Sequence, residues 1–358
     1  MSLMRDEILE QADIVERLTS DPAPFRAAVS GARRARVRVV LYCARGTSDN
    51  AAVYGKYLAT INAGLPAGLA VPSSATLYGA HVDYRDCLMF GISQSGETPD
   101  VVECLARARE GGAFTIAITN DGDSPLARRA HCVLVTGAGP ERAVAATKTY
   151  TSQLAALAMF WSAWCDDQRM LAALGRQAPA AMRAALDLES EVHEVAQWLR
   201  FSERLLVTAR GYNFATALET ALKLKETSYI AAVPHSAADL MHGPIAVVER
   251  GYPVLAFALP GATYAGMRVL VEDLASRGAE LVVVDGGPGD ISIAPARPAA
   301  VAGDLGGNRL LRLACDLPEP LSPLVAVIPA QLLALHLAAA RGNDPDRPRG
   351  LDKVTRTL

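Results

Sequence analysis

The chain lacks the charge excess, the cysteine pattern and the leader that would place it in several large classes of protein. Its 35 basic and 38 acidic side chains leave a net charge of −3, so we predict no nucleic-acid partner. Its six cysteines (43, 87, 104, 132, 165 and 315) show no CxxC spacing, and we expect most of them to be small core residues in a reducing compartment. No cationic segment followed by an apolar one opens the chain, which predicts a cytoplasmic protein.

A membrane-spanning segment and a nucleotide-binding motif are also missing. The apolar region from Pro323 to Ala340 is interrupted by Pro329, Gln331 and His336, and its unbroken stretches are much shorter than the ~20 residues that a span requires. We therefore expect a buried helix there, after a short strand, and no membrane partner. The turns described below match neither the Walker A pattern nor the dinucleotide glycine fingerprint, so the predicted ligand is not a nucleotide.

What the 358-residue chain does contain is a regular alternation of short apolar runs with helical patterns. Helices are predicted from Met4 to Leu18 and from Ala178 to Phe201. In the first half the expected strands are 37–43, 69–71, 87–92, 114–119 and 132–136, and the expected helices are 50–63, 98–111 and 147–164. This alternation is typical of an α/β fold in which helices cover both faces of a parallel sheet.

The pattern then repeats. Ala209-Arg210-Gly211 follows a strand-like run as Ala44-Arg45-Gly46 does, and a helix at 215–228 and strands at 254–257 and 281–284 follow in the same order. We predict two tandem three-layer αβα domains. The predicted parts are an N-terminal helical segment (1–30), a first domain (31–170), a second domain (171–340) and a C-terminal tail (341–358). The Gly- and Pro-rich segment 288–298 is expected to be a loop.

A hydroxyl-rich turn, Ser93–Thr98 (SQSGET), joins an apolar strand to a helical segment. Backbone N–H groups at such a turn favour an anion, and the hydroxyls add neutral donors. Because the turn holds no lysine or arginine, we predict a small phosphate bound mainly by neutral donors. The alternative is a simple capping turn with Ser95 or Thr98 as the N-cap.

A second turn of this kind, Arg45–Asn50, follows the strand-like run 37–43. Ligands of open α/β sheets sit outside the carboxyl ends of strands, so the two turns predict one phosphorylated ligand held from both sides. The second half has no serine-rich turn at the corresponding place. We therefore assign phosphate binding to the first half and expect the second half to supply chemistry.

One helix of the second half carries charges beside an apolar line. Glu219, Lys223 and Glu226 stand at i, i+4 and i+7, and fall within about 60° of arc. At a buried edge, Glu226 would suit a proton shuttle. The alternative is a solvated Glu–Lys pair.

Two further candidates lie outside regular elements. His242 precedes Gly243-Pro244, which places its imidazole on a loop, suited to proton transfer to a sugar ring oxygen or simply exposed. Lys353 lies in the polar tail, where its amine is solvated unless the tail straps a pocket and the amine forms a Schiff base with a carbonyl. No metal-ligand spacing occurs among the other histidines, and no metal or cofactor is predicted. These histidines have weaker claims to a role: His81, His131, His193, His235 and His336.

Together these segments resemble the double sugar-isomerase (SIS) domain family, and in particular the isomerase half of glucosamine-6-phosphate synthases (glutamine–fructose-6-phosphate amidotransferases). The resemblance covers nearly the whole chain. The motifs that carry it recur in the family's order: Gly46–Ser48, Ser93–Thr98, Val144–Lys148, Leu218–Glu226, His242–Pro244 and Pro348–Lys353.

The resemblance implies a role for each of these positions. Glu226 would move a proton between C1 and C2, and Glu219 and Lys223 would position it or contact substrate hydroxyls. His242 would open the sugar ring in the neighbouring subunit's site of a homodimer, and Lys353 would engage the ketose carbonyl. The implied phosphate ligands are Ser48, Ser93, Gln94, Ser95 and Thr98, and the implied sugar-binding positions are Thr47, Val144 and Ala146.

The chain departs from the synthase pattern in three ways. Arg45 stands where the synthase usually has cysteine, and Ala146 where it usually has serine. No glutaminase domain with a nucleophilic cysteine precedes Arg5, so we expect no release of ammonia from glutamine. The isomerisation would then run hydrolytically, converting glucosamine 6-phosphate and water to fructose 6-phosphate and ammonia. The alternatives are a galactosamine-phosphate substrate, an ammonia-dependent synthase, a fructosamine-phosphate deglycase, an aldose–ketose isomerase and a sugar-phosphate-binding regulator.

Overall fold

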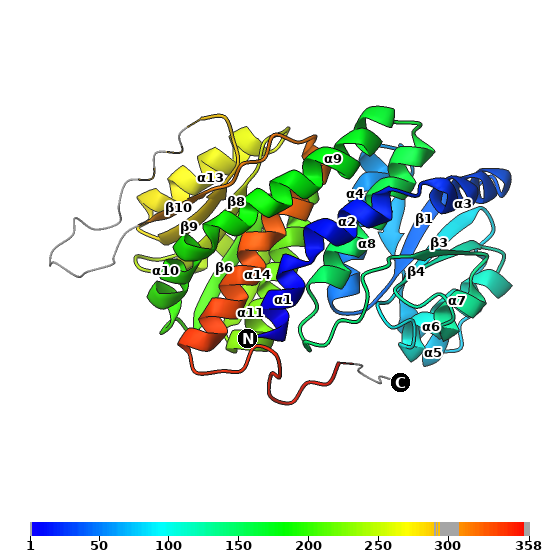
Figure 1. Ribbon diagram of the computed structural model, residues 1–358, viewed down its shortest axis with the longest axis horizontal. Helices are drawn as coiled ribbons and strands as arrows, with labels where there is room; N and C mark the ends of the chain where they lie inside the picture. Colours follow the sequence, from blue (N-terminus) through cyan, green and yellow to red (C-terminus); the bar gives the residue numbers. More distant parts are fainter. Residues whose placement is uncertain (1, 290, 292, 294–307, 354–358) are drawn as a thin grey trace, which may run out of the picture. The chain divides into compact units, whose positions relative to one another are not determined.

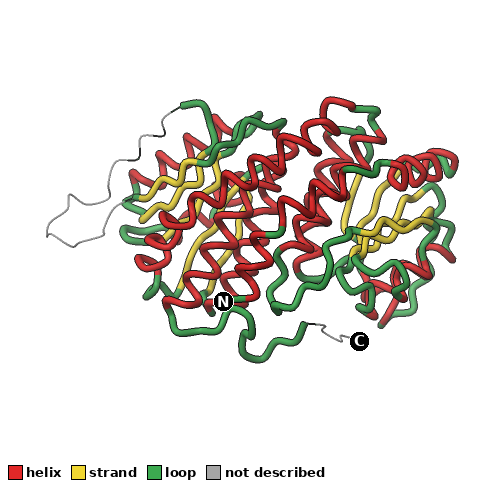
Figure 2. Tube along the Cα trace, viewed as in Figure 1, coloured by secondary structure: helices red, strands yellow, loops and turns green. Residues whose placement is uncertain are grey.

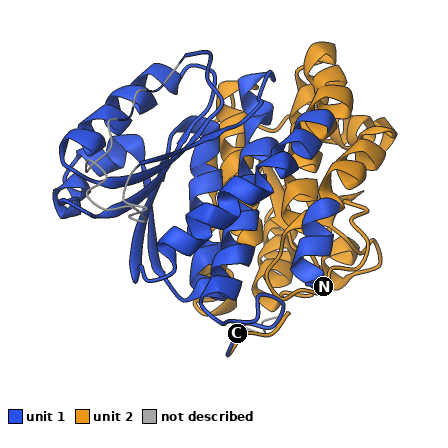
Figure 3. Cartoon of the chain, turned by 60° about the vertical axis from the view of Figure 1, so that its left-hand side comes forward, with its two compact units in different colours: residues 1–9, 180–349 blue, residues 10–179, 350–358 orange. Residues whose placement is uncertain are grey.

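The chain forms two compact units, each built on its own sheet (Figure 3). The computed structural model describes residues 2–289, 291, 293 and 308–353. Unit 1 comprises residues 1–9 and 180–349, and unit 2 comprises residues 10–179 and 350–358. Each unit holds one five-stranded parallel sheet flanked by helices (Figure 2). The predicted α/β fold with two parallel sheets is confirmed.

The sheet of unit 2 has the strand order β2-β1-β3-β4-β5. Its strands are β1 (Val39–Cys43), β2 (Ala67–Leu69), β3 (Cys87–Ile92), β4 (Phe114–Thr119) and β5 (Cys132–Val135). Its helices are α2 (Gln11–Thr19), α3 (Ala23–Arg34), α4 (Thr47–Ile61), α5 (Pro72–Thr76), α6 (Pro99–Glu110), α7 (Pro125–Arg129) and α8 (Lys148–Trp164) (Figure 1). Helix α9 (Gln168–Ala185) runs on into unit 1.

Both faces of this sheet are covered, which explains why every residue of β3 is buried. On one face, Cys43 and Met89 belong to an apolar cluster with residues of α6 and α7. On the other face, the ring of Tyr42 stacks on Phe90, and the Nε1 of Trp161 in α8 donates a hydrogen bond to the Tyr42 hydroxyl. Neighbouring residues of a strand point to opposite faces, so one apolar run contributes side chains to the cores on both faces of the sheet.

The sheet of unit 1 has the order β10-β9-β8-β6-β7, again all parallel. Its strands are β6 (Arg204–Ala209), β7 (Ala231–Ser236), β8 (Pro253–Ala258), β9 (Glu280–Asp285) and β10 (Arg309–Arg312). Its helices are α1 (Leu3–Leu9), α10 (Glu189–Leu199), α11 (Phe214–Ser228), α12 (Ala237–Met241), α13 (Tyr264–Ser276) and α14 (Ser322–Ala340). Read from β7, this order matches that of unit 2, which confirms the duplication.

Helix α14 is the apolar segment that raised the question of a membrane. By length and composition alone the stretch Glu319–Ala340 could cross one, but 83% of its most apolar window is buried inside the structure. It packs against α10 and α11. This is the environment of a core helix, as predicted, although a 3-10 turn (Glu319–Leu321) rather than a strand leads into it.

Two predicted helices are each divided in the structure. The single helix from Met4 to Leu18 is wrong, because the chain breaks at Glu10 into α1, which packs on α14, and α2, which packs on α8. The continuous helix from Ala178 to Phe201 is also wrong. Helix α9 begins earlier, at Gln168, and a 3-10 turn at Leu186–Leu188 separates it from α10. Buried positions continue through that turn, so apolar spacing does not reveal the change in hydrogen bonding.

Several smaller features were not foreseen. Helix α3 and the edge strands β7 and β10 were not among the expected elements. Strand β7 contains Pro234, a residue that strand patterns exclude except at a sheet edge. Four of the cysteines are buried, whereas Cys132 is half-buried and Cys165 exposed. Most of the predicted loop 288–298 lies outside the described residues.

Candidate functional site

The two hydroxyl-rich turns of unit 2 follow adjacent strands. Strands β1 and β3 pair in parallel from Val39 opposite Cys87 to Cys43 opposite Gly91, so their carboxyl ends lie side by side. The strand order changes direction at this pair, and open α/β sheets bind ligands in the crevice outside such a switch point. The structure therefore brings Gly46–Ser48 and Ser93–Thr98 to one edge of the sheet.

The hydroxyls of the Ser93–Thr98 turn form hydrogen bonds with other groups of the same turn. The Oγ of Ser93 accepts a hydrogen bond from the Gly96 N–H at 3.1 Å and lies 3.2 Å from the Oγ1 of Thr98. The Oγ of Ser95 accepts from the Glu97 N–H at 3.2 Å. Thr98 is the N-cap residue of α6, but its side chain makes no capping hydrogen bond. The serine oxygens accept hydrogen bonds from backbone N–H groups, and the oxygens of a bound anion would accept from the same N–H groups.

Gly96 fixes the shape of this turn. Its φ is +65°, in the region that favours glycine. A Cβ at this position would lie 2.2 Å from the Oγ of Ser124, the residue that caps α7 by accepting from the Ala127 N–H. The turn is thus packed directly against the start of the next helix.

The other turn is shorter than predicted. Helix α4 begins at Thr47 rather than at residue 50, because Gly46 takes a positive φ of 57° as its N-cap and the chain turns helical at once. Thr47 and Ser48 therefore lie in the first turn of α4. Ser48 is buried, and its Oγ accepts a hydrogen bond at 3.0 Å from the Nε2 of Gln153 in α8.

The charged stripe of α11 in unit 1 is buried. Glu219 and Lys223 have side chains that are 0% and 2% exposed, and Glu226 is 24% exposed. The Nζ of Lys223 lies 2.5 Å from a Glu226 oxygen and 3.6 Å from a Glu219 oxygen. The alternative of a solvated pair is wrong. Charges are kept in such an interior only when they are paired, so Lys223 holds Glu226 in place while part of its carboxylate stays accessible.

His242 lies directly after α12 on an exposed turn, as expected from Gly243-Pro244. Its backbone N–H donates to the Asp239 carbonyl. Within the part of the chain that the structure describes, its ring has no hydrogen-bond partner. The structure therefore places this imidazole where another molecule can reach it, and does not attach it to the α11 charges.

Lys353, in the tail segment of unit 2, has a partner that the sequence did not reveal. Its Nζ donates to the Oε2 of Glu141 and to the Ala143 carbonyl, both at 2.7 Å. Glu141 is fully buried and also accepts from the N–H of Thr147 and from the N–H and Oγ1 of Thr149. Burial alone would raise the pKa of Glu141, but the charge of Lys353 and these hydrogen bonds together lower it.

Glu141 therefore organises the segment in which sugar contacts were predicted. Val144 and Ala146 lie half-buried in the loop that Glu141 closes by bonding to Thr147, just before α8. A single carboxylate in a loop has no periodic signal. The only sequence clue was its position three residues before the Val144–Lys148 motif.

The equivalent turn in unit 1 is filled by the chain itself. Gly261, after β8, has a φ of +135°, and a Cβ there would lie 2.1 Å from the Glu319 carboxyl carbon. The Ala262 N–H donates to the Oε2 of Glu319 at 2.8 Å. An internal carboxylate thus sits where the first half presents Ser93–Thr98.

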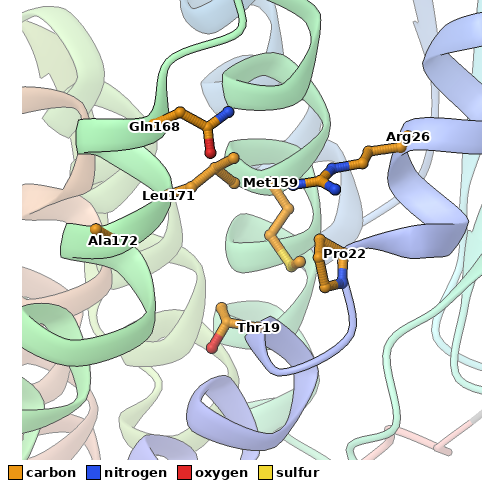
Figure 4. A pocket seen from close by; sticks show the side chains of 7 residues that line it. All are labelled: Thr19, Pro22, Arg26, Met159, Gln168, Leu171 and Ala172. Atoms are coloured by element: carbon orange, nitrogen blue, oxygen red, sulfur yellow. The ribbon is translucent and has the colours of Figure 1, made fainter.

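One hollow of unit 2 lies apart from the predicted site, and the described residues form no metal-binding group. A pocket of 240 Å³ in unit 2 contains none of the predicted site residues, and Arg26 is the one ionisable side chain in its lining (Figure 4). The lining residues are Thr19, Pro22, Arg26, Met159, Gln168, Leu171 and Ala172. Among the described residues, no three His, Cys, Asp or Glu side chains are grouped to hold a metal ion.

Fold and turns together define a duplicated α/β protein with a hydroxyl-lined turn at one switch point. The family model for the SIS domain matches residues 34–163 and 199–296. The chain belongs to the SIS-domain family.

Two curated relatives are glutamine–fructose-6-phosphate aminotransferases. The protein from Methanothermobacter thermautotrophicus is 37% identical over 317 residues, which are 88% of this chain and 51% of that protein. The human aminotransferase numbered 2 is 33% identical over 332 residues, which are 90% of this chain and 46% of that protein. The chain thus spans about half the length of these curated relatives.

Solved structures match the chain almost from end to end. The C-terminal domain of glucosamine-fructose-6-phosphate aminotransferase from Francisella tularensis has a TM-score of 0.84 at 28% identity, covering 97% of this chain and 98% of that one. A glucosamine-6-phosphate deaminase from Thermotoga maritima has a TM-score of 0.77, covering 99% of this chain and 100% of that one. At 21% identity, that second match shows the fold alone.

Proposed function

We propose that this chain is a phosphosugar isomerase that converts glucosamine 6-phosphate, or a related amino-sugar phosphate, to fructose 6-phosphate and ammonia. The observation that carries the proposal is the buried Glu219–Lys223–Glu226 group, present in the same chain as a hydroxyl-lined anion turn. Burying Glu219 and Lys223 beside the half-buried Glu226 is costly and gives weak stability, so such a group points to chemistry rather than to folding.

In the proposed reaction the substrate phosphate is bound by five polar residues: Ser48, Ser93, Gln94, Ser95 and Thr98. Thr47 and the Val144 and Ala146 backbone contact the sugar. His242 from the partner subunit of a homodimer opens the ring by moving a proton between the ring oxygen and the C1 hydroxyl. This produces a free aldehyde at C1 next to the amine-bearing C2.

Glu226 then takes the proton from C2. The electron pair of that bond forms a C1–C2 double bond, while the C1 carbonyl pair moves to its oxygen, which takes up a proton to give an enolamine. Glu226 delivers a proton to C1 after exchange with water, and the nitrogen lone pair forms a C2=N bond, which leaves an iminium at C2. Water adds to the imine carbon, and ammonia leaves as the C2 carbonyl forms. The amine of Lys353 engages the C2 carbonyl of the ketose, and Glu141 holds this amine in position. General acid–base catalysis of this kind contributes about 10²–10⁴-fold in rate.

An ammonia-dependent synthase, which runs the same steps backward, is the second candidate. It is favoured by the similarity to proteins named as aminotransferases. A sugar-phosphate sensor is less well supported, because binding a phosphate needs the Ser93–Thr98 turn but gives no reason for a half-buried carboxylate held by a buried lysine, Lys223.

The test is to incubate the purified chain with glucosamine 6-phosphate and measure ammonia and fructose 6-phosphate, and separately to supply fructose 6-phosphate with ammonium. Galactosamine 6-phosphate and a fructosamine phosphate serve as rival substrates. Net ammonia release supports the deaminase, whereas net consumption of ammonium supports the synthase. Lack of turnover in every assay, with fructose 6-phosphate binding intact, would leave only the sensor.

A further inference from the structure

A cation, Arg45, stands at the two turns proposed to bind phosphate. Arg45, the residue before Gly46, reaches from the end of β1 to Asp100 in the first turn of α6. Its Nη2 and Nε lie 2.8 and 3.2 Å from the same oxygen, Oδ2 of Asp100. The Asp100 side chain is 9% exposed and that of Arg45 45% exposed, so the pair is partly shielded from water.

The carboxylate of Asp100 is badly placed for binding an anion. It lies two residues after Thr98, at the helix N-terminus that the Ser93–Thr98 turn presents. A helix N-terminus favours one negative charge, and a bound phosphate would have to share this favourable potential with Asp100. The turn itself contributes only neutral donors, so nothing within it offsets the repulsion between the carboxylate and the phosphate.

A second acid lies in the same region. Asp49 is in the first turn of α4, the helix that begins directly after Gly46. Its burial raises its pKa, and the charge of Arg45 opposes that shift. Arg45 therefore acts on an acid in the first turn of each of the two helices that follow the phosphate turns.

We propose that Arg45 is a positioning residue for phosphate recognition: by cancelling the charge of Asp100, it allows the first turn of α6 to receive a phosphate beside Gly46–Ser48. The neutral donors of the two turns then accept a phosphate dianion that the carboxylate would otherwise repel. This inference rests on the proposed function, which assigns the phosphate group of the substrate to these turns.

The competing explanation is a structural ion pair with no influence on ligands. Partly exposed pairs contribute little to stability, so the two explanations differ in what their variants do. If charge is what matters, Arg45→Lys retains binding, Arg45→Gln weakens it, and adding Asp100→Asn to Arg45→Gln restores it. If the ion pair has no influence on ligands, Arg45→Gln binds as the wild type does. If Arg45 acts by holding the loops rather than by its charge, adding Asp100→Asn restores nothing.

The experiment is isothermal titration of fructose 6-phosphate, without ammonia, into the wild type and these variants. Arg45→Gln is expected to bind about tenfold more weakly, the scale of one unpaired charge near a partly shielded anion. Arg45→Lys and the Arg45→Gln/Asp100→Asn double variant are expected to stay within about threefold of the wild type. Thermal unfolding of each variant confirms that the fold is retained.

A Ser95→Ala/Thr98→Ala variant separates failure of this inference from failure of the proposed function. If it loses affinity while Arg45→Gln binds as the wild type does, the role of Arg45 is overturned and the phosphate turn stands. If Arg45→Gln is weak and the double variant does not recover, the charge argument is overturned. If the wild type does not bind, or Ser95→Ala/Thr98→Ala binds unchanged, the proposed phosphate site itself is wrong.

Discussion

At the scale of single residues, Lys223 decides whether the carboxylates of α11 can be tolerated. It is almost completely buried between Glu219 and Glu226. Removing one member of a buried ion group leaves uncompensated charge and costs about 3–5 kcal/mol. Lys223→Met is therefore expected to lower the free energy of unfolding by that amount in urea titrations.

The exposed Lys225 on the same helix provides the matched control. Lys225→Met should change the free energy of unfolding by less than about 0.5 kcal/mol, as surface substitutions do. If both variants behaved alike, the charges of α11 would not be buried as the structure shows.

Glu141 gives a pH-dependent prediction. Its pKa in the folded chain lies below its ordinary value of 4.5, although burial opposes this, because Lys353 and the hydrogen bonds favour the carboxylate. In the unfolded chain the group binds its proton more readily. The stabilisation is therefore fully present above the unfolded-state pKa and is lost as the pH falls through the folded-state value.

We expect the free energy of unfolding of the wild type to decrease more steeply between pH 6 and pH 3 than that of Glu141→Gln. Urea titrations at several pH values measure both slopes. Equal slopes would show that the contact between Lys353 and Glu141 contributes nothing to the folded state.

At the scale of elements, the strand-to-helix turn after β3 depends on the absence of a side chain at Gly96. Gly96→Ala would place a methyl group against Ser124 and force a left-handed residue to carry a Cβ. We expect a loss of about 1–3 kcal/mol in chemical denaturation.

Gly175→Ala is the contrasting substitution in the same unit. Gly175 lies within α9, its φ is not positive, and a Cβ there would make only ordinary contacts with Thr19. Helix propensity predicts no loss, and a gain of up to about 1 kcal/mol. A loss at Gly175 equal to that at Gly96 would contradict this account of the turn.

Sequence patterns predicted elements well where periodicity and burial agree. Strand β3 and the helix around Glu226 were found because apolar runs and an i, i+4, i+7 spacing are local signals. The division of the N-terminal helix at Glu10 was not found, since it depends on which distant helix each part packs against. Glu141 was missed for the same reason, because its partner Lys353 lies more than two hundred residues away.

At the scale of the whole molecule, the same fold occurs twice, with different residues at the equivalent strand-to-helix turns. Both sheets have the same strand order, yet the turn after β3 offers hydroxyls and the turn after β8 receives the Glu319 carboxylate. The sequence showed that the serine-rich turn occurs only in the first half. The sequence did not show that the other half fills its turn from within, because Glu319 comes from a segment 57 residues further along the chain.

The central claim is that Glu226 moves a proton between C1 and C2 of a sugar phosphate. The most direct test follows glucosamine 6-phosphate by NMR in deuterated water, with the wild type and Glu226→Gln. We expect the wild type to form fructose 6-phosphate with deuterium at C1, and Glu226→Gln to be about 10²–10⁴-fold slower with unchanged substrate affinity. Product formation by Glu226→Gln at the wild-type rate would contradict the account.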